Sequence, residues 1–285
     1  MKTLFAYLDL LGFKDLILHH TSLELRRIIK QFVQQLNDSV MKSREYSAIN
    51  SQGDVILGYE KIDDILEFRM LSDSILVWCK VNNERTCCIL LEAIQQMLYW
   101  SFKNAHPLRG GITYGDVFLH KVHNAEYSIN NESIFGKALL HAYSLESLVE
   151  WSGCIVTPQA WTKIQRLWKG LRIPIKTPAG LFNYVPLLVW YSVPFKIKNG
   201  DNRIKHIRCI ALDWNDIHRG EITSDEIASC LNPHNAVSMQ KSIETKNFIE
   251  YTKGLHKLYD DVQLLETIKI PPRRFTIRLG LRKRM

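Results

Sequence analysis

Apolar and polar positions in the first half of the chain alternate between strand and helix patterns. The apolar run 3–11 ends at Gly12 and is typical of a central strand. From Phe13 to about Ser43 the apolar residues recur at the spacing of a helix, and a break into two helices is expected at Thr21. The elements expected after it are a strand and turn at 45–60, two strands at 65–80, a helix at 84–103, a strand at 108–122, a helix at 135–150 and a strand at 154–157.

This order, β-αα-ββ-α-β-α-β, predicts the α+β class, with helices packed on one mainly antiparallel sheet. Two more strands are expected at 182–197 and 206–214, and mostly helical structure at 222–265. We therefore expect one domain over residues 1–215 and a mostly helical C-terminal extension over residues 216–285.

The composition favours a soluble, cytoplasmic protein. Hydrophobic residues make up 46% of the 285 positions, and no apolar run approaches the roughly 20 residues of a membrane helix. Asp9 interrupts the first apolar run, which argues against a signal peptide. The 6 Cys residues form no CxxC pair and fit buried free thiols in a reducing compartment.

The net charge of +8 is concentrated at the C-terminus. Residues 273–285 hold many Arg and Lys and no acid, which leaves the rest of the chain close to neutral. A basic tail can contact phosphates, anionic lipid or an acidic partner, or it can simply be solvated. The near-neutral body does not predict stable nucleic-acid binding.

Two acids occur where a charge is costly. Asp9 ends the first apolar strand, and Asp73 lies in a turn between two apolar strands. Carboxylates on adjacent strands can hold a pair of divalent metal ions and promote displacement at phosphorus. Alternatively, Asp9 caps the next helix and Asp73 is an ordinary turn acid. The sequence contains no P-loop and no Gly-x-Gly-x-x-Gly motif.

Four segments resemble motifs of the class III nucleotidyl cyclases, in the order in which that family has them. They are FAYLDLLGFKDLI at 5–17, RMLSDSILVW at 69–78, LRGGITYGDVFL at 108–119 and IFGKALLHAYSLES at 134–147. The resemblance implies the cyclase form of the α+β sandwich, which is ferredoxin-like. It also implies that Asp9 and Asp73 bind two Mg²⁺ or Mn²⁺ ions.

The chain departs from the purine cyclases at the two positions that steady the ribose and the transition-state phosphate, and at the two positions that read the base. Leu140 and Ser144 stand where purine cyclases have Asn and Arg, and neither can replace a guanidinium. Arg69 stands at the position of the adenine-reading lysine, and its acidic partner would fall near Ser133. Either activity has been lost, or a different base and a different cation are used.

The overall pattern resembles the pyrimidine cyclases of bacterial anti-phage systems of the Pycsar type. Shared features are the Tyr-Leu-Asp-Leu-Leu-Gly-Phe start, Asp213-Trp214 and the late helix at 241–251. This resemblance implies conversion of CTP or UTP to cyclic CMP or cyclic UMP. The product would then act as a second messenger on a separate effector protein.

The resemblance also implies roles for individual residues. The Leu10 carbonyl would be a further metal ligand, and the amides of Leu11, Gly12 and Phe13 would lie near the triphosphate. The active site would form at a homodimer interface. The candidates for a cation on the triphosphate are Arg109, Lys14 and Lys137, each of which also fits an ordinary salt bridge or a helix surface. Arg69 would address the base or pair with a neighbouring acid.

Other functions remain open from the sequence. A purine cyclase with an unusual base pocket is one, and a cyclase-fold sensor that binds nucleotide without turnover is another. A palm-like nucleic-acid-binding domain also carries two strand-borne Asp residues, although the near-neutral body argues against it.

Overall fold

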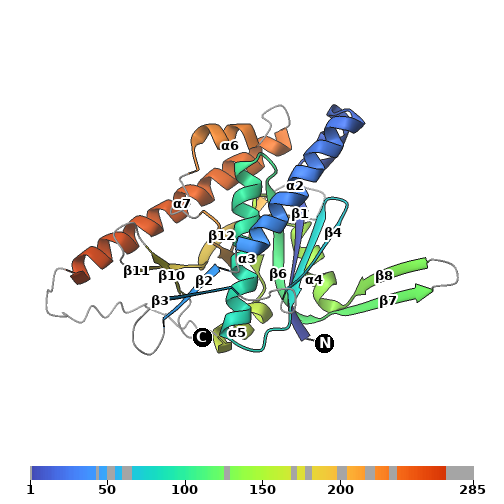
Figure 1. Cartoon of the computed structure of the whole chain (residues 1–285). Coiled ribbons are helices and arrows are strands. Elements are labelled where there is room, and N and C mark those ends of the chain that lie inside the picture. Colours follow the sequence, from blue (N-terminus) through green and yellow to red (C-terminus); the bar gives the residue numbers. More distant parts are fainter. Residues whose placement is uncertain are drawn as a thin grey trace, which may run out of the picture.

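A seven-stranded mixed sheet forms the centre of the molecule. The computed structural model describes residues 2–42, 45–49, 55–59, 66–124, 129–167, 172–176, 182–197, 204–215, 222–230 and 236–267. In this part of the chain the strand order is β12-β13-β9-β6-β1-β5-β4. Strands β6 and β9 pair in parallel, and the other neighbours in this sheet are antiparallel. The predicted α+β class is therefore confirmed (Figure 1).

The sheet contains strands from both halves of the sequence. Its members are β1 (Lys2–Leu10), β4 (Leu66–Leu71), β5 (Ser74–Cys79), β6 (Leu108–Asp116), β9 (Gly153–Val156), β12 (Leu188–Lys196) and β13 (Ile204–Leu212). Three separate hairpins are β2 (Glu45–Ile49) with β3 (Val55–Tyr59), β7 (Phe118–Asn124) with β8 (Ile129–Phe135), and β10 (Arg172–Lys176) with β11 (Phe182–Pro186).

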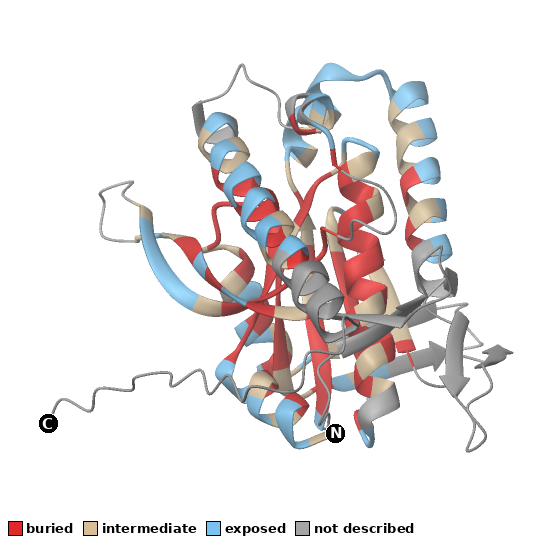
Figure 2. Ribbon diagram, turned by 90° about the vertical axis from the view of Figure 1, so that its left-hand side faces the viewer, coloured by how far each residue is buried: buried red, intermediate tan, exposed pale blue. Residues whose placement is uncertain are grey.

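Helices cover both faces of this sheet. They are α1 (Phe13–His19), α2 (Ser22–Lys42), α3 (Glu84–Lys103), α4 (Lys137–Glu146), α5 (Pro158–Leu167), α6 (Ser224–Cys230) and α7 (Ala236–Thr267). Buried residues concentrate in the strands and in α3, the helix packed against them (Figure 2). No helix in the described ranges is long and apolar enough to cross a membrane.

Alternation along β1 decides which face each side chain occupies. Leu4, Ala6, Leu8 and Leu10 belong to the large core that includes α2 and α3 side chains, whereas Phe5 belongs to a smaller cluster under α4. Since successive strand residues point to opposite faces, Asp9 lies on the α4 face with Phe5. The core strand thus places one carboxylate on the side where α4 ends.

The long helix α7 belongs to the same core as the sheet. Phe248 of α7 packs edge-on against Trp151 with ring centroids 4.4 Å apart, and it also contacts Tyr191. Farther along, His256 Nε2 lies 2.6 Å from Asp213 Oδ2, and both side chains are buried. The predicted domain boundary at residue 215 remains a prediction, but the hydrophobic core runs across it.

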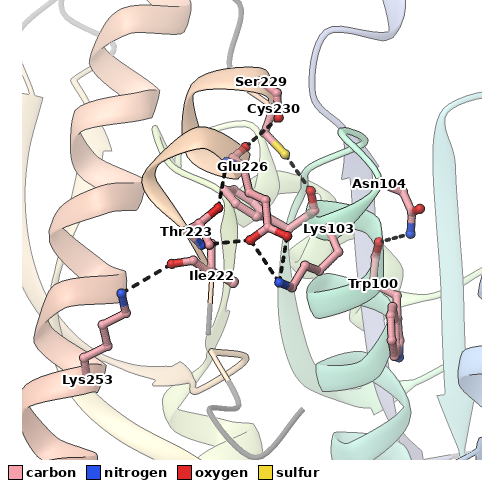
Figure 3. Close-up of polar contacts among 10 residues, drawn as sticks. Trp100, Lys103, Asn104, Ile222, Thr223, Glu226, Ser229, Cys230 and Lys253 are labelled. Atoms are coloured by element: carbon pink, nitrogen blue, oxygen red, sulfur yellow. Dashed lines mark hydrogen bonds and ion pairs between the residues drawn. The ribbon is translucent and has the colours of Figure 1, made fainter. Parts of the chain in front are cut away.

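The short helix α6 ties α7 to the end of α3 (Figure 3). Lys103 of α3 forms an ion pair with Glu226 at 2.7 Å, and Thr223 N donates to the same carboxylate at 2.8 Å. Lys253 Nζ of α7 donates to Ile222 O at 3.3 Å. The C-terminal helices are therefore fixed next to the C-terminal end of α3.

The structure differs from the predicted elements in several places, and one of them is the predicted strand 182–197, which is divided into β11 and β12 at Leu187. The predicted strand 108–122 is divided at Val117: β6 stays in the main sheet and β7 leaves it to pair with β8. Helix α5 was not predicted, although Pro158 at its first position is a common helix start. Strands β8 and β10 were not predicted either. The basic tail 273–285 lies outside the described residues.

Candidate active site

The ends of β1 and β5 bring Asp9 and Asp73 to one edge of the sheet. Asp9 pairs with Ser74 in the antiparallel ladder, and Leu10 N donates to Asp73 O at 3.1 Å. Ser72, with a φ of 59°, and Asp73 form the tight two-residue turn between β4 and β5, and this turn lies beside the end of β1. The predicted proximity of these two acids is present in the structure.

Arg109 lies opposite Asp9 on β6 and connects it to a second carboxylate. Its Nη2 is 3.4 Å from Asp9 Oδ2 and 2.6 Å from Glu146 Oε1, and its Nη1 donates to Val149 O at 3.2 Å. All three charged side chains are largely buried. Arg109 is thus placed beside Asp9, and its predicted contact with a triphosphate remains a prediction.

The two carboxylates in this cluster are harder to ionise than usual. Burial raises the pKa of Asp9, Arg109 opposes this rise, and the nearby charge of Asp73 adds to it. Burial likewise raises the pKa of Glu146 to about 7, against the attraction of Arg109, and the charge of Asp9 raises it further. Burial is thus the main reason why both carboxylates resist ionisation, and Arg109 only partly offsets it.

Small residues allow Glu146 to come this close to the sheet. The buried positions of α4 are Ala138, Ala142 and Glu146, which lie one helical turn apart. Beneath α4, a Cβ at Gly111 would lie 3.1 Å from Leu145 Cβ. Glu146 is not among the site residues that the sequence predicts. The detectable signal was an acid in line with two small residues on one helix face.

The oxygen ligands of this cluster suit Mg²⁺ or Mn²⁺. Carboxylates are the preferred ligands of these ions, and Asp9 and Asp73 come together at the ends of neighbouring strands. Asp9 and Asp73 would hold the ions. No group of three or more His, Cys, Asp or Glu side chains with metal-binding geometry occurs in the described ranges.

In the described part of the chain, two cavities adjoin the ends of β1 and β5, where this cluster lies. The first has a volume of about 320 Å³, and Leu10, Leu11, Gly12, Phe13, His106 and Lys241 contribute to its wall. The second has a volume of about 510 Å³, and its wall includes Tyr7, Arg69, Ser74, Leu139, Leu140 and Tyr143. The predicted triphosphate loop and the predicted base-contacting Arg69 therefore face different cavities.

The remaining predicted cations and base contacts lie as follows. Arg69 Nη1 donates to Phe68 O at 2.7 Å, and its guanidinium lies 5.9 Å from the ring centroid of Trp78. Lys14 and Lys137 are exposed. The glycine at position 12 has a φ of +80°, a left-handed conformation that glycine adopts without strain, so the chain can turn sharply after β1.

Comparisons with known proteins find nucleotide cyclases among solved structures. No protein-family model and no curated protein matches the chain. It is similar to the adenylyl cyclase CyaB from P. aeruginosa, with 12% identity over 74% of this chain and 93% of that one, at a TM-score of 0.42. The guanylate cyclase domain of RhGC from Catenaria anguillulae, in complex with GTP, gives 9% identity, coverage of 74% and 95%, and a TM-score of 0.45.

A third structure is the dimeric guanylyl cyclase domain of the RhoGC fusion protein from Blastocladiella emersonii. It has 12% identity, coverage of 64% of this chain and 92% of that chain, and a TM-score of 0.41. Since all three TM-scores and identities are low, we take the function from the side chains of the site.

Proposed function

We propose that this protein is a metal-dependent nucleotidyl cyclase that converts CTP or UTP to the 3′,5′-cyclic nucleotide and pyrophosphate. The observation that carries the proposal is the cluster at the end of β1, where Asp9 meets Asp73 and the buried pair of Arg109 and Glu146. Two acids at the ends of neighbouring strands are the ligands that a two-metal phosphoryl-transfer site requires.

Each residue of the cluster has a distinct task. Asp9 and Asp73 would hold two Mg²⁺ or Mn²⁺ ions, which activate the 3′-hydroxyl and neutralise the leaving pyrophosphate when bound. Arg109 fixes the Asp9 carboxylate through its contact at 3.4 Å and is itself held by Glu146 and by Val149 O. In the reaction the 3′-oxygen attacks the α-phosphorus, the bond to pyrophosphate breaks, and the hydroxyl proton passes to solvent.

The cavity of about 510 Å³ is the proposed base site. Its wall is mostly apolar, and its polar side chains include Arg69 and the Tyr7 hydroxyl, which lies 2.5 Å from Ser74 Oγ. Arg69, in this wall, stands where purine cyclases have the adenine-reading lysine, and the Leu140 side chain beside it offers no hydrogen bond to a base. Together with the sequence resemblance, this supports a pyrimidine rather than a purine substrate.

The same face supports a homodimer. Leu71, Phe135, Leu140 and Tyr143 line this cavity although each is more than half exposed. Large apolar side chains exposed together are typical of an interaction surface. We propose that a second copy of the chain packs on this exposed apolar surface, next to the base site. The cyclic product would act on a separate effector protein in anti-phage defence.

Product analysis tests the proposal directly. Purified protein is incubated with Mn²⁺ and each of the four radiolabelled nucleoside triphosphates, beside Asp73→Asn and the control Asp38→Asn, an exposed acid of α2. We expect a cyclic pyrimidine nucleotide from the wild type and the control only. A cyclic purine would contradict the base assignment, and product from Asp73→Asn would contradict the metal site.

A nucleotide sensor without turnover is the second candidate. Leu140 and Ser144 favour it, because neither can stabilise charge that develops on a transferring phosphate. This candidate predicts nucleotide binding by calorimetry with no product from any of the four triphosphates.

A further inference from the structure

Helix α7 brings a lysine to the candidate active site. Lys241 lies in the first third of the helix, its side chain is 17% exposed, and it forms part of the wall of the 320 Å³ cavity beside Leu10 and Gly12. Its Nζ lies 3.9 Å from Glu150 Oε2. This distance is at the limit of an ion pair, so Glu150 holds the ammonium only weakly.

The electrostatic surroundings of Lys241 include the catalytic cluster. Burial lowers its pKa, and the neighbouring Arg109 lowers it further, whereas Glu150 and Asp9 favour the charged form. Lys241 thus lies in the wall of the cavity with a second cation, Arg109, in its electrostatic surroundings. Placing a second buried cation there has a free-energy cost, which an anion bound in the cavity would offset.

Hydrogen bonds fix this part of α7 to the strand that carries Arg109. Ser152 N donates to Thr245 Oγ1 at 2.8 Å, one helical turn after Lys241. Ser152 Oγ in turn donates to Leu108 O at 2.9 Å, adjacent to Arg109. All three residues are buried, so the position of Lys241 relative to Asp9 and Arg109 is determined by the core.

We propose that Lys241 is a substrate-binding residue whose ammonium contacts the β- and γ-phosphates in the 320 Å³ cavity, supplied by the same chain as Asp9. This inference rests on the proposed function for its substrate. The geometry favours Lys241 over Arg109, which is already bound to Asp9, Glu146 and Val149 O. It also favours Lys241 over Lys14, which is exposed.

Binding of inorganic tripolyphosphate tests the proposal without requiring catalysis. Calorimetry in Mg²⁺ compares the wild type with Lys241→Met, Lys241→Arg and the control Lys246→Met, an exposed lysine of the same helix. We expect Lys241→Met to weaken binding about tenfold or more, since hydrogen bonds to charged groups contribute strongly. Lys241→Arg should recover part of the loss, and Lys246→Met should bind as the wild type does.

A second variant, with the opposite expected effect on binding, keeps the proposal testable if Lys241→Met does not fold. Glu150→Gln removes the carboxylate that competes for Lys241, so tripolyphosphate should bind more tightly. In the cyclase assay, Lys241→Met should raise KM more than it lowers kcat, because the ground-state contact is lost. Wild-type affinity in a folded Lys241→Met protein, or no tripolyphosphate binding by the wild type, would overturn the inference.

The test separates this inference from the proposed function. If the wild type makes no cyclic product but Lys241→Met loses tripolyphosphate, the phosphate contact stands and the cyclase proposal fails. If the wild type makes product and Lys241→Met has the same KM for CTP and UTP, the cyclase proposal stands and the role of Lys241 fails.

Discussion

Replacement of Glu146 by Gln should change how the stability of this protein depends on pH. The side chain is largely buried, and its pKa is raised from 4.5 to about 7 in the folded protein, mainly by burial. A raised pKa means that the folded state prefers the protonated acid. Glu146 therefore costs no stability below about pH 4.5, and its cost grows as the pH rises and is complete above about pH 7.

The size of the effect follows from the shift. Each pKa unit corresponds to about 1.4 kcal/mol, so the full cost of the Glu146 charge is roughly 3 kcal/mol, and about 2 to 3 kcal/mol of it develops between pH 5 and pH 8. Asp9 titrates with Glu146 as a coupled pair, and its pKa is also raised, so the two act in the same direction. Glutamine has no charge to bury and removes the Glu146 contribution at every pH.

Urea unfolding at pH 5 and pH 8, with EDTA present, measures this contribution. Relative to the wild type, Glu146→Gln should gain about 2 to 3 kcal/mol between the two pH values. Glu250→Gln, an exposed acid of α7, is the control and should show no such gain. A difference between Glu146→Gln and wild type that is the same at pH 5 and pH 8 would refute the reasoning.

Three further predictions follow from the packing and the charges. Gly110→Ala should destabilise the fold by about 1 to 3 kcal/mol in urea unfolding, because its Cβ would lie 2.2 Å from Tyr7 O in the neighbouring strand. Phe248→Ala should cost about 3 to 5 kcal/mol in the same assay, since its ring is fully buried against Trp151 and Tyr191. Saturating Mn²⁺ at about 100 times its Kd should stabilise the wild type by about 2.7 kcal/mol, and Asp9→Asn should lose most of this in thermal unfolding.

Local patterns predicted the N-terminal half of the fold well. The apolar run at 3–11 appears as β1, and the break at Thr21 separates α1 from α2. There Thr21 N donates to Glu24 Oε2 at 2.9 Å. This contact joins residues only three positions apart, so the local sequence is enough to predict it. The division at Val117 depends instead on which partner each strand pairs with, and alternation along the chain carries no information about partners.

The site could be predicted where its residues carry a local signal. Asp9 and Asp73 were detectable because each acid interrupts or separates apolar strands, and their meeting follows from the antiparallel pairing of β1 and β5. Glu146 lies more than 100 residues from Asp9 in the sequence. A glutamate at this position would be equally common on a helix exposed to solvent, so the residue alone does not indicate a site. Only the burial of Ala138 and Ala142 reveals that this helix face points inward.

Lys241 illustrates why the other residues of the site could be found only from the three-dimensional structure. In the sequence it is one of several lysines in a polar helix, and the helical pattern places Phe248, Ile249 and Thr245 inward without saying what they face. The aromatic contact of Phe248 with Trp151 and the hydrogen bond of Thr245 with Ser152 set the helix against β9, next to β6. Because these contacts join residues almost 100 positions apart, the helix that seemed an extension of the domain contributes to the wall of its candidate active site.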